Sequence, residues 1–135
     1  MLQNKSKEEI NIYNQSNVDN KQADVVLIQL PLWGMCHPPL ALGILKSHLG
    51  HNGISCKTFD INAHAFSTRG KQNYDLWHLK HTFTEQFWNR KKMVKLYNDW
   101  RPLMLYYMNE IKKLNPIVLG CSVFDSSRLF TKIFL

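Results

Sequence analysis

The sequence lacks any long apolar run. No stretch approaches the roughly 18 consecutive apolar residues that a membrane-spanning helix requires. The first 22 residues also lack the apolar segment of a secretory signal peptide. These absences predict a cytoplasmic protein with no membrane partner.

Cysteine is scarce and scattered. Cys36, Cys56 and Cys121 form no CxxC or CxxxCxxC group, so their spacing provides neither a zinc ribbon nor a cluster-binding motif. Separated cysteines in odd number are typical of reduced thiols. Cys36 adjoins His37, but adjacent residues cannot easily face one tetrahedral ion, and no third ligand has motif spacing. We interpret this pair as a loop histidine beside a partly buried thiol.

Phosphate-binding motifs are also missing. The chain has neither GxGxxG nor GxxxxGKS/T, so the sequence does not indicate a dinucleotide or a nucleoside triphosphate as ligand. The formal net charge is +7, but the basic residues are spread and are densest only at residues 89–92. No basic stripe interleaved with aromatics forms one recognisable module, and we expect no direct nucleic-acid binding.

The residues that are present suit one domain. The chain has 135 residues, of which 44% are hydrophobic and 20% charged, enough apolar material for a core. Residues 1–22 are rich in Asn, Gln, Ser and Lys, and we interpret them as a mobile polar leader. The domain then covers residues 23–135.

The periodicity of apolar residues predicts an α/β domain. Buried strands are expected at residues 23–30, 54–62 and 116–124, with a helix over 39–49 that stops at the glycines of 50–53. Helical spacing predicts a helix or helix pair at 74–96 and another at 100–114, with Asn98 or Asp99 as its cap. Residues 125–127 are expected to cap a last helix. The aromatic stripe of this region is interpreted as core.

Strand, helix and strand joined by short links imply right-handed parallel crossovers. The predicted fold is an incomplete Rossmann-like (flavodoxin-like) doubly wound parallel sheet, with a helical insertion at residues 63–114 between the second and third strands. Such sheets usually need about five strands to cover both edges. We therefore expect this chain to be the front part of a larger domain, truncated or completed by another polypeptide.

Open α/β sheets bind ligands at the carboxyl ends of their strands, which here are residues 31–38, 60–64 and 122–126. Trp33, in the first of these loops, suits a large flat ligand. Asp60 could bind a ribose hydroxyl, but without an upstream glycine motif we expect Asp60 and Asn62 to cap the next turn. His64, His78 and His81 have no metal-ligand spacing.

One combination of features spans residues 25–62. It comprises a strand ending in Pro31, the aromatic Trp33, Pro38-Pro39-Leu40 leading into a helix, Gly53, and Asp60-Ile61-Asn62 at the end. This combination resembles the opening of the cobalamin-binding domain found at the N-terminus of cobalamin-dependent radical S-adenosylmethionine (radical SAM) enzymes. NPIVLGCSVF, residues 115–124, is similar to the third strand of that domain.

The resemblance implies a bound cobalamin. In the cofactor site that it implies, one side of the corrin is lined by Pro31, Leu32 and Trp33, and the loop is fixed by Pro38, Pro39 and Leu40. The residues beneath or beside the ring are Ser122, Val123, Phe124 and Asp125. The DxHxxG motif of other cobalamin domains is absent, since Met35 stands two residues before His37 and Leu40 three after it. Cobalamin is therefore expected without an axial histidine from that motif. This setting implies a methyltransferase-type parent enzyme.

A radical SAM domain would also need a CxxxCxxC motif for a [4Fe-4S] cluster, and the chain has none. The cluster, S-adenosylmethionine and catalysis are then expected in a missing part, together with the C-terminal half of the domain. Two alternatives remain. One is a non-catalytic α/β interaction module whose aromatic helices dock a partner, and the other is a flavodoxin-like domain binding a different flat cofactor such as a flavin.

Overall fold

The computed structural model describes residues 22–35, 38–68, 70, 76–77 and 89–135. Its centre is a sheet of three parallel strands, β1 (Val25–Gln29), β2 (Cys56–Asp60) and β3 (Val118–Ser122). Their order is β2-β1-β3, with β1 in the middle. Val25 is in register with Cys56 on one side and with Val118 on the other. The carboxyl ends of all three strands therefore meet at one edge.

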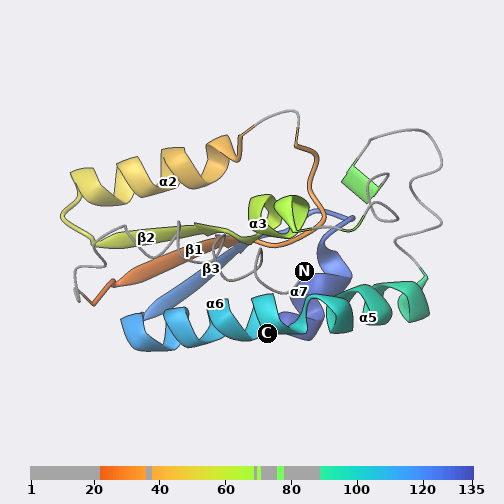
Figure 1. Cartoon of the computed structure of the whole chain (residues 1–135). Coiled ribbons are helices and arrows are strands. Elements are labelled where there is room, and N and C mark those ends of the chain that lie inside the picture. Colours follow the sequence, from red (N-terminus) through yellow and green to blue (C-terminus); the bar gives the residue numbers. More distant parts are fainter. Residues whose placement is uncertain (1–21, 36–37, 69, 71–75, 78–88) are drawn as a thin grey trace, which may run out of the picture.

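Helices lie on both faces of this sheet (Figure 1). Helix α2 (Leu40–His51) covers one face, and α5 (Arg90–Asp99), α6 (Arg101–Leu114) and α7 (Arg128–Phe134) lie on the opposite face. Helix α3 (Ile61–Ser67) follows β2 directly. This arrangement confirms the predicted α/β class and the incomplete, doubly wound parallel sheet.

Successive side chains of β1 point to opposite faces, as they must in a strand. Val26, Ile28 and Leu30 are fully buried in the main core, which lies between the sheet and α5–α7. Leu27 and Gln29 are buried on the α2 side instead. A strand buried on both faces explains why residues 25–30 are apolar almost without interruption.

Two described aromatic residues of the insertion, Trp77 and Trp100, are buried in the core, as predicted. The Trp100 ring meets the Trp77 ring at 5.3 Å and the Phe130 ring at 5.7 Å between centroids. Trp77 and Phe130 are both buried. Along α6, the buried residues Met104, Ile111 and Leu114 follow the helical spacing. The predicted helix at 74–96 falls partly outside the described residues. Its described part comprises residues 76–77, which form a single turn, and residues 89–96, which belong to α5 from Arg90 on.

Two expectations about element ends are wrong, and a third is met only in part. The second strand stops at Asp60 rather than at residue 62, because the Asp60 carboxylate accepts a hydrogen bond from Ala63 N at 2.9 Å and starts α3. Asp99 belongs to α5, and α6 begins after Trp100 without a side-chain cap. Ser127 is the N-cap residue of α7, as predicted, but its hydroxyl bonds back to Phe124 and makes no capping hydrogen bond.

The C-terminus of α2 matches the glycine signal with a shift of two residues. The helix continues through Gly50 to His51, and Asn52 is its C-cap. Gly53 then has a φ of +73°, in the left-handed region that glycine adopts without steric cost. The predicted leader and the residues Cys36, His37, His78 and His81 lie outside the described residues, apart from residue 22. Within the described ranges, no helix combines the length and apolar character that crossing a bilayer requires.

Candidate functional site

The loops after β1 and β3 meet at the carboxyl edge of the sheet. The Trp33 and Phe124 rings stack with their centroids 3.7 Å apart and their planes inclined by 22°. Next to them, the Ser126 hydroxyl donates a hydrogen bond to the Leu32 carbonyl at 2.5 Å. Two loops separated by about 90 residues of sequence are thereby joined at one site.

Asn62 connects the segment after β2 to the same site. Its side chain is 2% exposed, and its Oδ1 accepts hydrogen bonds from Trp33 N at 2.9 Å and from Trp77 Nε1 at 2.8 Å. Its Nδ2 donates to the Trp33 carbonyl at 3.0 Å and lies 3.2 Å from Met35 Sδ. Asn62 therefore holds the Trp33 backbone from both sides.

The expectation that Asn62 caps a turn is wrong, whereas Asp60 does cap α3. The hydrogen bonds of Asn62 go to residues far away in the sequence, so they produce no local sequence pattern that could have predicted them. The only signal was the position of Asn62 just beyond the second strand, at the edge where the loops meet.

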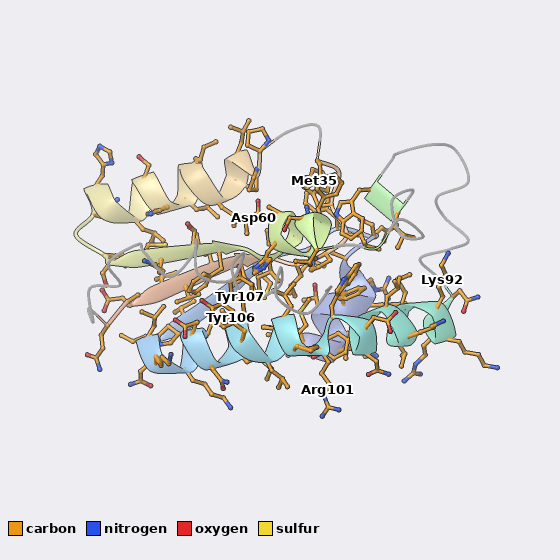
Figure 2. The ribbon with its side chains drawn as sticks, in the orientation of Figure 1. Met35, Asp60, Lys92, Arg101, Tyr106 and Tyr107 are labelled. Carbon is orange, nitrogen blue, oxygen red and sulfur yellow. The ribbon has the colours of Figure 1, made fainter. Side chains whose placement is uncertain are left out.

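The Trp33–Phe124 pair is partly open to solvent. Phe124 is 39% exposed, and Trp33 has intermediate exposure. Val123 and Met35 are exposed beside this pair in the chain, and Figure 2 shows Met35 beyond the carboxyl end of the sheet. The site thus offers an apolar, aromatic surface. One face of each ring is taken by the other ring.

The other predicted site residues divide into three groups. Pro31 and Leu32 are almost fully buried, so they support the loop from beneath. Pro38, Pro39 and Leu40 lie at the start of α2, where the Pro38 and Pro39 carbonyls accept hydrogen bonds from amides of the first turn. Leu40 is 67% exposed. Ser122 is half-buried at the end of β3, and Asp125 is exposed.

A row of polar residues crosses the sheet beneath this site. Gln29 is in register with Asp60 on one side and with Ser122 on the other, so the three side chains share the α2 face. Gln29 is 1% exposed, and its Nε2 donates to the Leu30 carbonyl at 3.4 Å. Sequence analysis missed Gln29 because it lies within an apolar run.

His64 is placed away from the aromatic pair. Its Nδ1 lies 3.1 Å from the Tyr107 hydroxyl of α6, and the Tyr107 ring also meets Phe59 edge-on at 5.5 Å. Burial lowers the pKa of His64 from its ordinary value of 6.5, because a charged ring is poorly solvated there. A neutral imidazole in this position serves packing between α3 and α6.

The two described cysteines are free thiols. Burial raises the pKa of Cys121, and it raises that of Cys56 in spite of the opposing charge of Lys46. Neither has the lowered pKa of a nucleophile or metal ligand. Within the described part of the chain, no three His, Cys, Asp or Glu side chains cluster in a way that could hold a metal ion.

No protein-family model, curated protein or solved structure matches this chain.

Proposed function

We propose that the carboxyl edge of the sheet binds cobalamin and positions its corrin ring for a radical SAM catalytic domain outside this chain. The stacked Trp33–Phe124 pair carries this proposal, because two partly exposed aromatic rings lie at the sheet edge where doubly wound folds bind ligands. The resemblance of residues 25–62 to the cobalamin domain of radical SAM enzymes supports it as well.

The chemistry of the loops fits a large, flat ligand without a dominant negative charge. The three segments contain the carboxylates Asp60 and Asp125 and no Lys or Arg between residues 31 and 35 or 122 and 126, so they do not favour a phosphate group. Val123 and Met35 extend the apolar surface beyond the two rings. When bound, the corrin would supply the methyl-transfer chemistry, and this chain would supply orientation and an apolar surface.

In this proposal the buried residues Pro31 and Leu32 fix the backbone of the first loop. Ser126 and Asn62 hold that loop against its neighbours through the Leu32 carbonyl and the Trp33 backbone. The sheet would be completed by a further α/β segment, the C-terminal half of the domain. The [4Fe-4S] cluster and S-adenosylmethionine would belong to the catalytic domain beyond it.

The test is retention of the cofactor. The purified chain is incubated with hydroxocobalamin, free ligand is removed by gel filtration, and the visible spectrum is recorded. We expect corrin absorbance to co-elute with the protein and to fall in Trp33→Leu and Phe124→Leu. Tyr106→Leu, at an exposed tyrosine of α6 (Figure 2), is the matched control and should retain the wild-type absorbance.

A folded sample that retains no corrin contradicts autonomous cobalamin binding by this chain. The same experiment with flavin mononucleotide tests the flavodoxin-like alternative, which the strand order favours because flavodoxin-like sheets also begin 2-1-3. Retention of the flavin without the corrin would replace our proposal with that alternative. The non-catalytic interaction module is favoured by a different feature, the exposed strand β3.

A further inference from the structure

Two histidines stand three residues apart at the C-terminal end of α2. His48 and His51 both belong to its last turn, and both are exposed. Side chains three residues apart in a helix are neighbours on one face, with about 5–6 Å between their Cβ atoms. Both histidines also line one shallow hollow of about 490 Å³ on the surface of α2. The two imidazole rings are therefore close enough to contact a single bound ion.

The ring of His51 is oriented by a hydrogen bond to its own helix. Its Nδ1 lies 2.7 Å from the carbonyl oxygen of Ser47. A carbonyl oxygen only accepts hydrogen bonds, so Nδ1 carries the proton and the neutral ring has its lone pair on Nε2. Histidines that bind metals usually donate their other ring N–H to a carbonyl or carboxylate in this way. His51 is thus held in the tautomer that a metal ligand requires.

The ring of His48 is available to join it. Among the described residues, the hydrogen bonds of His48 involve only its backbone. Its carbonyl accepts from Asn52 Nδ2 at 2.8 Å and from Asn52 N at 3.3 Å. The side chain can therefore turn toward His51 without breaking a hydrogen bond of its ring.

The helix end that carries this pair is well defined. Beyond the Asn52 cap, Gly53 N donates to the Gly50 carbonyl at 3.1 Å and Ile54 N donates to the Leu49 carbonyl at 3.0 Å. These hydrogen bonds fix the last turn of α2 and the spacing of the two histidines. The C-terminal turn of a helix is also the negative end of its dipole, which favours a nearby cation.

The one lysine of α2 does not crowd the pair. Lys46 stands two residues before His48 and five before His51, and residues at these spacings lie on different faces of a helix. Its charge acts instead on the thiol of Cys56 in β2. The face that His48 and His51 share therefore carries no permanent positive charge from α2 itself.

We propose that His48 and His51 bind one divalent transition-metal ion through their Nε2 atoms, with Zn²⁺ as the test ion. Imidazole nitrogens suit Zn²⁺, Ni²⁺ and Cu²⁺, whereas Mg²⁺ and Ca²⁺ prefer oxygen ligands. The described residues add no third His, Cys, Asp or Glu ligand. Because Zn²⁺ in proteins is almost always four-coordinate, water would occupy the positions that the two histidines leave open.

This site is separate from the proposed cofactor site. The His51 end of α2 leads into the start of β2, whereas the aromatic pair lies at the carboxyl ends of the strands (Figure 1). Metal binding at α2 therefore does not depend on cobalamin binding.

The test follows the imidazole nitrogens of the isotope-labelled full chain by NMR during a titration with Zn²⁺. We expect saturable shifts at the Nε2 signals of His48 and His51, and none when Mg²⁺ replaces Zn²⁺. Each histidine has its own signals, so binding elsewhere in the chain is not counted as binding at this pair.

Three variants test the pair. His48→Asn should weaken Zn²⁺ binding at His51 about tenfold, because one of the two ligands is lost. Lys46→His combined with His48→Lys keeps the composition and charge of α2 but separates the histidines onto different faces, and it should weaken binding equally. His64→Gln removes a histidine outside α2 and should leave the affinity unchanged. Circular dichroism checks that each variant remains folded.

Several results would overturn the proposal. One is the absence of saturable Zn²⁺ shifts at His48 and His51 in the folded wild-type chain. Wild-type affinity in the variant that separates the histidines would remove the role of their spacing. Weakening in His64→Gln as large as in His48→Asn would remove the role of the pair. Corrin retention is measured independently, so this proposal and the cobalamin proposal fail separately.

Discussion

At the scale of single residues, Asn62 does the most to assemble the site. Its carboxamide accepts hydrogen bonds from the backbone of Trp33 and the indole of Trp77, and it is almost completely buried. Buried donors that lose their acceptor keep the cost of desolvation without its compensation. The residue therefore links the stability of the fold to the geometry of the first loop.

Asn62→Ala tests this link. The substitution leaves the Trp33 amide and the Trp77 indole N–H without their acceptor, and we expect it to lower the free energy of unfolding by about 3 kcal/mol. Urea unfolding followed by tryptophan fluorescence measures the change. Asn109→Ala, at an exposed position of α6, serves as control and should be neutral or slightly stabilising. If Asn109→Ala lowers the free energy of unfolding as much as Asn62→Ala does, the stabilising role of the Asn62 hydrogen bonds is contradicted.

His64 predicts a dependence of stability on pH. Its pKa in the folded chain lies below the ordinary value of 6.5, so at mildly acidic pH the unfolded chain binds a proton that the folded chain does not. Its contribution to stability is therefore complete above about pH 6.5 and is lost as the pH falls from there through the folded-state pKa. We expect urea midpoints to fall over this window in the wild type, and to fall less in His64→Gln. Identical pH profiles for the two proteins would refute this role.

At the scale of elements, the strands and the longest helix were predictable because their patterns are local. A continuous apolar run specifies a doubly buried strand such as β1, and helical spacing specifies α6. The ends of elements depended on individual contacts instead. Asp60 ended β2 two residues early by capping α3, and the predicted cap of α6 by Asn98 or Asp99 was lost because α5 occupies those residues.

Two glycines around α2 give opposite predictions for the same substitution. Gly43 lies inside the helix, and a Cβ there would meet nothing within 4 Å, so Gly43→Ala should raise the free energy of unfolding by about 1 kcal/mol through helix propensity. Gly53 has a positive φ, so Gly53→Ala should lower it by about 1 kcal/mol. Thermal unfolding of the two variants measures whether each substitution raises or lowers stability. Changes in the same direction would show that backbone conformation does not determine the effect of alanine at Gly43 and Gly53.

At the scale of the whole molecule, the first and last described loops stabilise each other. The Trp33–Phe124 stack and the hydrogen bond from Ser126 to the Leu32 carbonyl join the loop after β1 to the loop after β3. These two loops are far apart in the sequence. These contacts also bring together the two rings on which the cofactor proposal depends. Removing this stack is therefore expected to lower both the free energy of unfolding and the binding of the proposed cofactor.

A double-mutant cycle measures this coupling. Trp33→Leu, Phe124→Leu and the double variant are unfolded in urea, and we expect an interaction free energy of about 1 kcal/mol between the two rings. Applying the same cycle to Trp33 and Tyr106 should give a value near zero, because Tyr106 packs against Tyr107 on α6. If the interaction free energy between Trp33 and Phe124 is no larger than in that control, the stack does not stabilise the fold.

Local sequence was sufficient for the class of fold and for the expectation that three segments meet at one edge, because apolar periodicity and parallel crossovers are properties of neighbouring residues. It was sufficient also for the exclusion of phosphate and cluster motifs. Tertiary structure alone decided that Trp33 stacks on Phe124, that Asn62 bridges two tryptophans, and that β3 is left uncovered. These features depend on distances between residues far apart in the chain, and such distances exist only once the sheet has aligned its strands.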